Sequence, residues 1–346
     1  MYKIAEEIFR QYNTLRKTYD YMLGRAEDIR SYINAKPYSS VTFLGCGSSY
    51  SICKSSEASY RIRTCMPANS FAAGDLLINH AAYEKLMKDT LLVIPSRSGS
   101  TSEVVLAAKS LVEETGTACI SICARKDSEL SHIQSLCLEI PWAFDESVCQ
   151  TGTVTNLYLA NLLLIGIIIN DVPLLRDLDS VINMGDSYIK QVNPTIEKIV
   201  ECEEWEKVIV LADSELAGIA EEGALAFNEI CRLPSNYYHV LDVRHGPMVL
   251  VDNATLAIVM CSPDDFSYQK DLVCDLKSRG AVVVTVSDGQ NTSWGSDYSI
   301  TVPSFANYGV YGIPFIFVPQ LLSYYKALKR GVNPDAPEGL NPWIKL

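Results

Sequence analysis

Four short apolar runs in the first half of the chain recur in the same order in the second half. The pairs are 39–47 with 206–214, 89–96 with 254–262, 116–122 with 280–286, and 136–141 with 298–303. Matched residues are separated by 162 to 167 positions, a small drift of the kind that differences in loop length produce. The sequence therefore indicates two copies of one structural unit, and the fold must accommodate both.

Each run is short, rich in β-branched residues and followed by a polar or helical stretch. This pattern is typical of strands that are buried on both faces of a parallel sheet. Helical stretches lie between the runs, as in residues 101–113, where several apolar side chains share one face. Alternating strands and helices predict an α/β fold with two three-layer α/β/α sandwiches and parallel sheets, joined near residues 170–195.

The domain organisation follows from the repeat and from the length of 346 residues. We expect an N-terminal helix over 1–30, a first domain over 31–180, a second over 195–330 and a closing tail over 331–346. The N-terminus lacks the apolar core and cleavage site of a secretory signal. The longest apolar run, 157–169, contains Asn161 and is shorter than the ~20 residues of a membrane helix. We therefore expect a buried helix there.

Charge and cysteine content narrow the function classes. The chain carries 41 acidic and 29 basic side chains, a net charge of −12. This balance disfavours nucleic acid and anionic membranes as partners, but it permits a small anionic ligand at a local site. The 11 cysteines include no C-x-x-C pair and no adjacent histidine cluster, so we expect no metal site. We expect buried, reduced thiols and a cytoplasmic protein.

The loop after the second run has the composition of a phosphate site. It reads Ser96-Arg97-Ser98-Gly99-Ser100-Thr101 and leads into a helix. Free N–H groups at a helix start favour an anion, and hydroxyls add uncharged donors. An ordinary Ser/Thr helix cap is the alternative interpretation.

Two further loops are rich in glycine or hydroxyls. In Gly45-Cys46-Gly47-Ser48-Ser49-Tyr50, Ser48 and Ser49 can bind sugar hydroxyls or phosphate, but Tyr50 replaces the third glycine of a dinucleotide fingerprint. Residues 146–153 place Thr151 near another helix start, where a capped helix explains the pattern equally well.

The second half offers acid–base groups instead. Glu222 and Glu229 are seven residues apart, which places both carboxylates on one face of an otherwise apolar helix. His245 follows Arg244 and precedes Gly246-Pro247 in a turn. Taken alone, His245 has a structural role as its main alternative, and we interpret the other histidines, His80, His132 and His239, as structural.

Together these loops resemble a family. The chain resembles tandem sugar-isomerase (SIS) domain proteins, in particular the isomerase half of glucosamine-6-phosphate synthase and free-standing fructosamine-6-phosphate deglycases and aldose-ketose isomerase/deaminases. The matching segments are Gly45–Tyr50, Ser96–Gly99, Glu146–Thr153, Glu222–Leu225 with Glu229, His245–Pro247 and Asp335–Pro337. The resemblance covers nearly the whole chain.

The resemblance implies roles for individual residues. Ser96, Ser98 and Thr101 would hold the substrate phosphate, and Ser49 and Thr151 would contact the sugar phosphate. Arg97 stands in place of a commoner Gln and would read an extra anionic group, with a solvated surface arginine as the alternative.

For catalysis, the resemblance implies that Glu229 moves a proton between C1 and C2, with Glu222 as a supporting carboxylate. His245 would open the sugar ring, often in the neighbouring subunit's site, which implies a homodimer. This chemistry needs no cofactor.

Departures from the family narrow the expected reaction. The chain begins Met1-Tyr2 in place of a glutaminase domain, Ala226 replaces a helix lysine, and Pro342 aligns with the Schiff-base lysine, with Lys345 as a shifted substitute. We expect an enzyme that releases the amine of an amino- or fructosamine-6-phosphate by deamination or deglycation. The alternatives are a non-catalytic sugar-phosphate sensor and a simple aldose-ketose isomerase.

Overall fold

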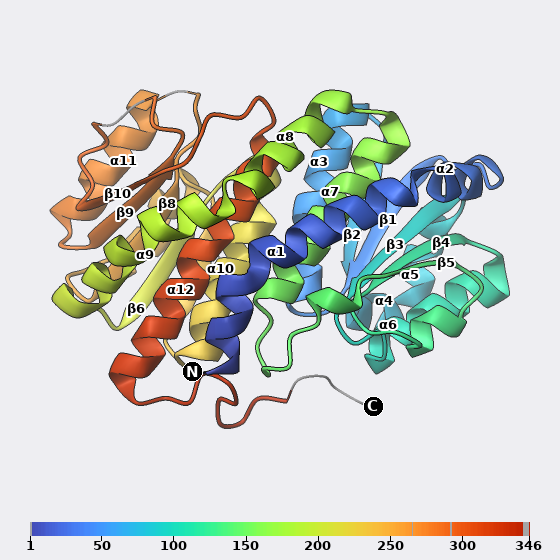
Figure 1. Cartoon of the computed structure of the whole chain (residues 1–346), viewed down its shortest axis with the longest axis horizontal. Helices are drawn as coiled ribbons and strands as arrows, with labels where there is room; N and C mark the ends of the chain where they lie inside the picture. Colours follow the sequence, from blue (N-terminus) through green and yellow to red (C-terminus); the bar gives the residue numbers. More distant parts are fainter. Residues whose placement is uncertain (1, 265, 291–292, 342–345) are drawn as a thin grey trace. The chain divides into compact units, whose positions relative to one another are not determined.

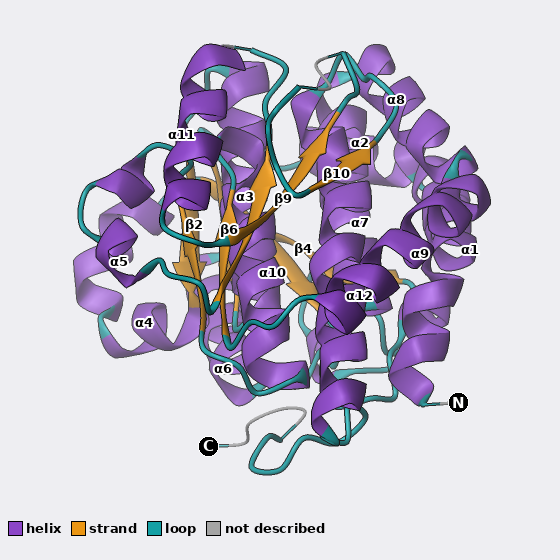
Figure 2. Ribbon diagram, turned by 90° about the vertical axis from the view of Figure 1, so that its left-hand side faces the viewer, coloured by secondary structure: helices purple, strands orange, loops and turns teal. Residues whose placement is uncertain are grey.

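The computed structural model describes residues 2–264, 266–290, 293–341 and 346. The chain forms two compact units, each built around one sheet (Figures 1 and 2). The first-sheet unit comprises Arg10–Glu146, Gln150–Asp179 and Asn341–Leu346. The second-sheet unit comprises Met1–Phe9, Ser147–Cys149 and Ser180–Leu340.

Helices and strands alternate along most of the chain. In order they are α1 (Lys3–Gly24), α2 (Ala26–Asn34), β1 (Ser40–Gly45), α3 (Ser48–Thr64), β2 (Ala68–Ala72), α4 (Ala73–Ile78), α5 (His80–Met87), β3 (Thr90–Ser96), α6 (Ser102–Lys109), β4 (Ala118–Cys123), β5 (Leu136–Glu139), α7 (Gly152–Ile169) and α8 (Val172–Asn183). There follow α9 (Gly185–Cys202), β6 (Lys207–Leu211), α10 (Ala217–Ile230), β7 (Ser235–Tyr238), β8 (Thr255–Met260), α11 (Phe266–Ser278), β9 (Val282–Ser287), β10 (Tyr298–Thr301) and α12 (Gly312–Arg330).

The first sheet is parallel, with strand order β2-β1-β3-β4-β5. Every residue of β1, β3 and β4 is buried, because helices cover both faces. One face packs through Leu92 and Ile94 against apolar side chains of α4 and α6. Helix α3 lies against β1 and β2 and also packs on α7. This unit is an α/β/α sandwich.

The second sheet repeats that topology. Its order is β10-β9-β8-β6-β7, again parallel throughout, so β6 to β10 correspond to β1 to β5. One face packs through Ala257 and Val259 against α11, and α10 and α12 pack together beside β6. The predicted fold class is therefore confirmed, and the paired apolar runs are the strands β1, β3, β4 and β5 with β6, β8, β9 and β10.

The sequence pattern missed one edge strand in each sheet. Strands β2 (ANSFA) and β7 (SNYY) are short, partly exposed and contain polar residues. They join the sheets through backbone hydrogen bonds to β1 and β6, which do not require an apolar run.

The structure adds detail to two helices that the sequence predicted, over residues 157–169 and 101–113. Helix α7 is buried over almost its whole length, as the apolar run 157–169 predicts. By length and composition alone α7 could cross a membrane, but 89% of it is buried inside the protein. Helix α6 ends at Lys109 and continues as a single π-helical turn over Ser110–Glu114.

The cysteines only partly match the expectation of buried thiols. All are free, and six of them are buried. The expectation is wrong for Cys65, Cys202 and Cys274, which are exposed.

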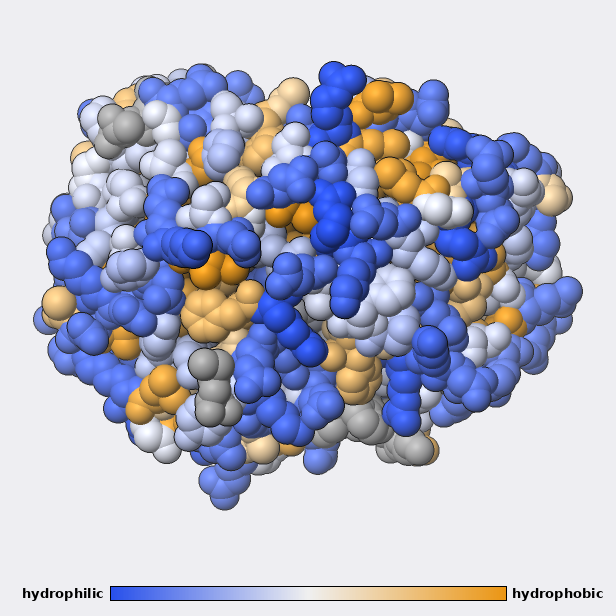
Figure 3. Space-filling model, in the orientation of Figure 1, coloured by the Kyte–Doolittle hydropathy of each residue, from blue (hydrophilic) through white to orange (hydrophobic). Residues whose placement is uncertain are grey.

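Figure 3 shows one face of the molecule, where hydrophilic side chains predominate and apolar patches are small and scattered.

Candidate functional site

The hydroxyl-rich loop between β3 and α6 folds tightly onto itself. The backbone N–H of Gly99 donates to Ser96 Oγ at 2.9 Å, and that of Ser100 donates to Ser98 Oγ at 3.2 Å. Ser98 Oγ and Thr101 Oγ1 lie 3.4 Å apart. Gly99 has φ +59°, and a Cβ there would lie 2.2 Å from Ser128 Oγ. Only glycine therefore fits at the centre of this loop.

The N-cap residue of α6 does not cap the helix with its own side chain. Thr101 occupies the N-cap position with extended backbone, and its side chain makes no capping hydrogen bond. The first-turn N–H groups therefore lack the usual partner from the N-cap side chain. The helix dipole favours negative charge at this end, where Glu103 stands in the first turn. Together with the surrounding hydroxyls, this arrangement suits a phosphate group.

Arg97, in the middle of this loop, is a buried residue. Its residue surface is 5% exposed, so the alternative of a solvated surface arginine is wrong. The adjacent Ser96 and Ser98 are also buried. Arginine is the residue type that recognises a phosphate by paired N–H donors.

The loop after β1 reaches the same edge of the first sheet, because β1 and β3 are parallel neighbours. A Cβ on Gly45 would lie 2.7 Å from the backbone carbon of Ser49, so this glycine allows α3 to begin directly against the strand. Ser48 and Ser49 form the buried first turn of α3. The structure thus places these two serines and the Ser96–Thr101 loop along one edge.

The third candidate loop is a capped helix start. Asp145 is buried, and its Oδ2 accepts the backbone N–H groups of Thr151 at 2.8 Å and Thr153 at 2.7 Å. Thr151 is completely buried. The carboxylate already occupies these donors, so this loop matches the capped-helix interpretation. No motif in the sequence indicates Asp145 as a cap, because it lies six residues before the N-cap Thr151.

The two carboxylates of α10 have different surroundings. Glu222 is 2% exposed, whereas Glu229 is half-buried and borders a pocket of about 550 Å³. The pocket is lined by the end of α10, with Asn228 and Arg232, and by Pro337–Leu340. Arg232 Nη1 lies 3.6 Å from Glu338 Oε2. The C-terminal segment therefore lies directly beside Glu229.

Asp335 holds other segments of the same unit in place through hydrogen bonds. The Asp335 carboxylate accepts the backbone N–H groups of Lys3 at 3.0 Å and Ile4 at 2.9 Å, and so caps α1. The Asp335 carbonyl accepts the N–H of Val148 at 3.0 Å. Pro342 and Lys345 lie outside the described residues.

His245 is exposed in a turn. Its backbone N–H donates to the Asp242 carbonyl at 2.8 Å, and Gly246 follows with φ +126°. The turn is fixed to α11 by Arg244, whose Nε and Nη2 lie 2.8 and 2.6 Å from Asp275 Oδ2. Nearby apolar residues are also exposed, namely Leu241, Val249 and Leu250.

The structure reveals a partner for His239 that the sequence did not indicate. His239 Nδ1 lies 2.9 Å from Asp213 Oδ1, at the carboxyl edge of the second sheet. No motif spacing links these two residues, which are 26 positions apart. Among the residues that the structure describes, no group of three or more His, Cys, Asp or Glu side chains could hold a metal ion.

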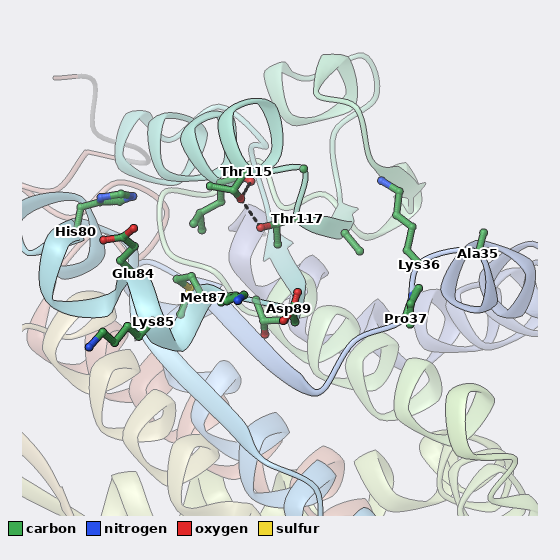
Figure 4. Close-up of a pocket in the computed structure, with 15 residues that line it drawn as sticks. Ala35, Lys36, Pro37, His80, Glu84, Lys85, Met87, Asp89, Thr115 and Thr117 are labelled. Atoms are coloured by element: carbon green, nitrogen blue, oxygen red, sulfur yellow. Dashed lines mark hydrogen bonds between the residues drawn. The ribbon is translucent and has the colours of Figure 1, made fainter.

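A second cavity lies at the opposite edge of the first sheet, near the starts of β1, β3 and β4 (Figure 4). Its volume is about 600 Å³. His80 and Glu84 lie together on one side, and Thr115 and Thr117 are joined by a hydrogen bond of 2.7 Å. Lysines and carboxylates both line this cavity, so its charge selects neither an anion nor a cation.

Comparison with known proteins places the chain in a family. A SIS domain matches residues 35–166 and again residues 202–330. The chain belongs to the SIS domain family. The first SIS match spans the strands of the first sheet and the second match spans those of the second sheet, which agrees with the internal repeat.

Relatives of this SIS protein carry names from amino-sugar metabolism. Glutamine–fructose-6-phosphate aminotransferase from Wigglesworthia glossinidia brevipalpis is 26% identical over 95% of this chain and 54% of that protein. The chain thus spans about half the length of that relative. D-galactosamine-6-phosphate deaminase from a Shewanella species is 28% identical over 88% of this chain and 79% of that protein.

Solved structures share the fold. Glucosamine-6-phosphate deaminase from Thermotoga maritima superposes with a TM-score of 0.80 at 25% identity, covering 99% of this chain and 100% of that chain. Tagatose-6-phosphate ketose/aldose isomerase from Escherichia coli gives a TM-score of 0.86 at 20% identity, covering 99% and 97%.

Proposed function

We propose that this SIS protein is an enzyme that moves a proton between C1 and C2 of an amino- or fructosamine-6-phosphate and releases the amine when water hydrolyses the resulting imine. The observation that carries the proposal is the start of α6, which has no cap from its N-cap side chain and is surrounded by the hydroxyls of Ser96, Ser98 and Thr101. The names of the relatives, which include two amino-sugar-phosphate deaminases, support the same substrate class.

In this proposal, the protein binds its substrate through the phosphate group. The first-turn N–H groups of α6 and the loop hydroxyls would donate to the phosphate oxygens, and the buried Arg97 would balance their charge. Ser48 and Ser49 would contact the rest of the sugar phosphate, whereas Thr151 is buried in the capped start of α7. Binding energy at this remote group positions the reacting carbons.

Proton transfer is assigned to the second-sheet unit. Glu229 borders an open pocket, so its carboxylate can take a proton from one carbon and return it to the next. Glu222 is buried and would act by holding α10 rather than by touching substrate. His245 would move protons to and from the ring oxygen, because an imidazole can both donate and accept near neutral pH.

We also propose that the protein works as a homodimer. His245 lies beside the exposed apolar side chains of Val249 and Leu250, which are 74% and 62% exposed. Apolar side chains gathered on a surface are typical of protein contacts. A second copy that covers this surface would bring His245 to a neighbouring site.

The test is an assay of amine release from a panel of 6-phosphorylated amino sugars and fructosamines. Glu229→Gln should abolish release but leave binding intact, and Ser98→Ala should raise KM with little change in kcat. Glu201→Gln, an exposed carboxylate of α9, is the control.

Binding without release would identify a sugar-phosphate sensor, and conversion without ammonia or amino acid would identify a simple isomerase. Full turnover by Glu229→Gln would remove the catalytic assignment.

A further inference from the structure

Three side chains at the carboxyl edge of the second sheet form a continuous hydrogen-bonded chain. His239 Nδ1 lies 2.9 Å from Asp213 Oδ1, and His239 Nε2 lies 3.1 Å from Tyr237 Oη. A carboxylate only accepts, so Nδ1–H donates to Asp213. In the neutral imidazole, Nε2 then accepts the Tyr237 hydroxyl, which fixes both the tautomer and the orientation of the ring.

The sheet geometry explains why these groups meet. Tyr237 and His239 are two residues apart at the end of β7 and therefore face the same side. Strand β6 is the parallel neighbour of β7, with Leu211 opposite Tyr238, so Asp213 leaves the sheet beside His239. Asp213 Oδ1 also accepts the backbone N–H of Val240 at 3.1 Å. One carboxylate oxygen therefore holds both the ring and the backbone that follows it.

The segment held in this way carries His245. The His239 carbonyl accepts the N–H of Val243 at 3.2 Å, and the Asp242 carbonyl accepts the N–H of His245 at 2.8 Å. These turns connect the two histidines through backbone hydrogen bonds over only six residues. We expect a displacement of the backbone at His239 to be passed along this hydrogen-bonded segment to His245.

Folding alone does not account for the pair. The side chains of His239 and Asp213 are 55% and 46% exposed, and side-chain pairs this exposed to solvent contribute little to stability. The segment is packed instead by the buried Val243 and Met248. Burial, aided by the negative charges of Asp213, Glu221 and Asp242, raises the pKa of Tyr237 well above its usual value, so the phenol remains a donor.

We propose that Asp213 and His239 are positioning residues that hold His245 in the orientation needed to open the sugar ring, with Tyr237 fixing the tautomer of His239. This inference rests on the proposed function and names a further part of its machinery. It concerns orientation, so the affinity for sugar phosphate should not depend on it.

The experiment measures ring opening directly, as enzyme-catalysed exchange between the α and β anomers of D-galactosamine-6-phosphate by exchange NMR. His239→Ala should slow this exchange about tenfold, because small displacements of a catalytic group are costly. His239→Asn, whose amide can still donate to Asp213, should restore most of the rate. Titration calorimetry with the same sugar phosphate should give an unchanged Kd.

Asp213→Ala, a second variant on the same pair, should reproduce the loss. The matched control is His132→Ala, since His132 makes a comparable exposed pair with Asp127 at 3.3 Å in the first-sheet unit. Anomer exchange that slows in His245→Ala but not in His239→Ala or Asp213→Ala overturns the positioning role alone. Anomer exchange that is unchanged in all three variants overturns the ring-opening role of His245 as well.

Discussion

The Asp145 carboxylate lies 2.8 Å from the backbone nitrogen of Thr151 and closes the start of α7 with an internal negative charge. At the start of α6, in the same unit, the N-cap residue Thr101 makes no capping hydrogen bond with its own side chain. The two helix starts looked alike in sequence, since hydroxyls surround both. The Asp145 carboxylate makes the first a structural cap, whereas the second is the helix start that we propose for the phosphate.

Asp145→Ala should destabilise the protein by about 2 kcal/mol, because two N–H groups of the α7 start lose a charged acceptor in a buried setting. Asp145→Asn should cost less, since its amide oxygen can still accept. Urea denaturation followed by circular dichroism measures both. Equal stability of wild type and Asp145→Ala would show that the cap contributes nothing.

Gly99→Ala should weaken binding of D-galactosamine-6-phosphate by about tenfold, the equivalent of about 1.4 kcal/mol. The added Cβ would lie 2.2 Å from Ser128 Oγ and force the loop out of shape. Gly116→Ala is the matched control, because Gly116 also has positive φ, +71°, but has open space around it. Calorimetry should show normal affinity for Gly116→Ala, and normal affinity for Gly99→Ala would contradict the assignment of this loop.

Gly223→Ala should loosen the contact between α10 and α12. A Cβ at Gly223 would lie 2.9 Å from Pro319 Cγ, and overpacking of this kind costs about 1–3 kcal/mol. The double variant Gly223→Ala/Pro319→Ala should recover part of the loss, because it removes the ring that the new methyl group meets. Thermal unfolding of the single and double variants checks this, and additive losses would argue against a direct clash.

Cys137 should react with iodoacetamide at unusually low pH. A hydrogen bond from Cys123 outweighs partial burial and lowers the pKa of Cys137 to about 7. The reactive thiolate therefore accumulates as the pH rises from 6 to 8. Mass spectrometry of the labelled peptide gives the midpoint. Cys123→Ala removes the donor, so the midpoint should move toward the ordinary thiol value of about 8.5; a midpoint that stays near 7 would rule out this hydrogen bond as the cause.

Much of the fold was predictable because buried parallel strands need continuous apolar runs. The runs containing Val41 and Val208 identified corresponding strands in two sheets. Edge strands β2 and β7 were not predictable in this way. Their pairing depends on backbone groups that every residue carries, so the sequence showed no pattern there.

The amino-acid sequence determined the repeat, the parallel sheets and the hydroxyl-rich loop, because local composition and periodicity set strand burial and turn formation. Tertiary structure alone decided that Arg97 is buried, that Asp145 occupies one helix start and that Asp213 meets His239. These outcomes depend on which chain segments become neighbours in space. Strand pairing brings together residues that are tens of positions apart in the chain. Over such separations, the spacing of residues in the sequence does not indicate which of them are in contact.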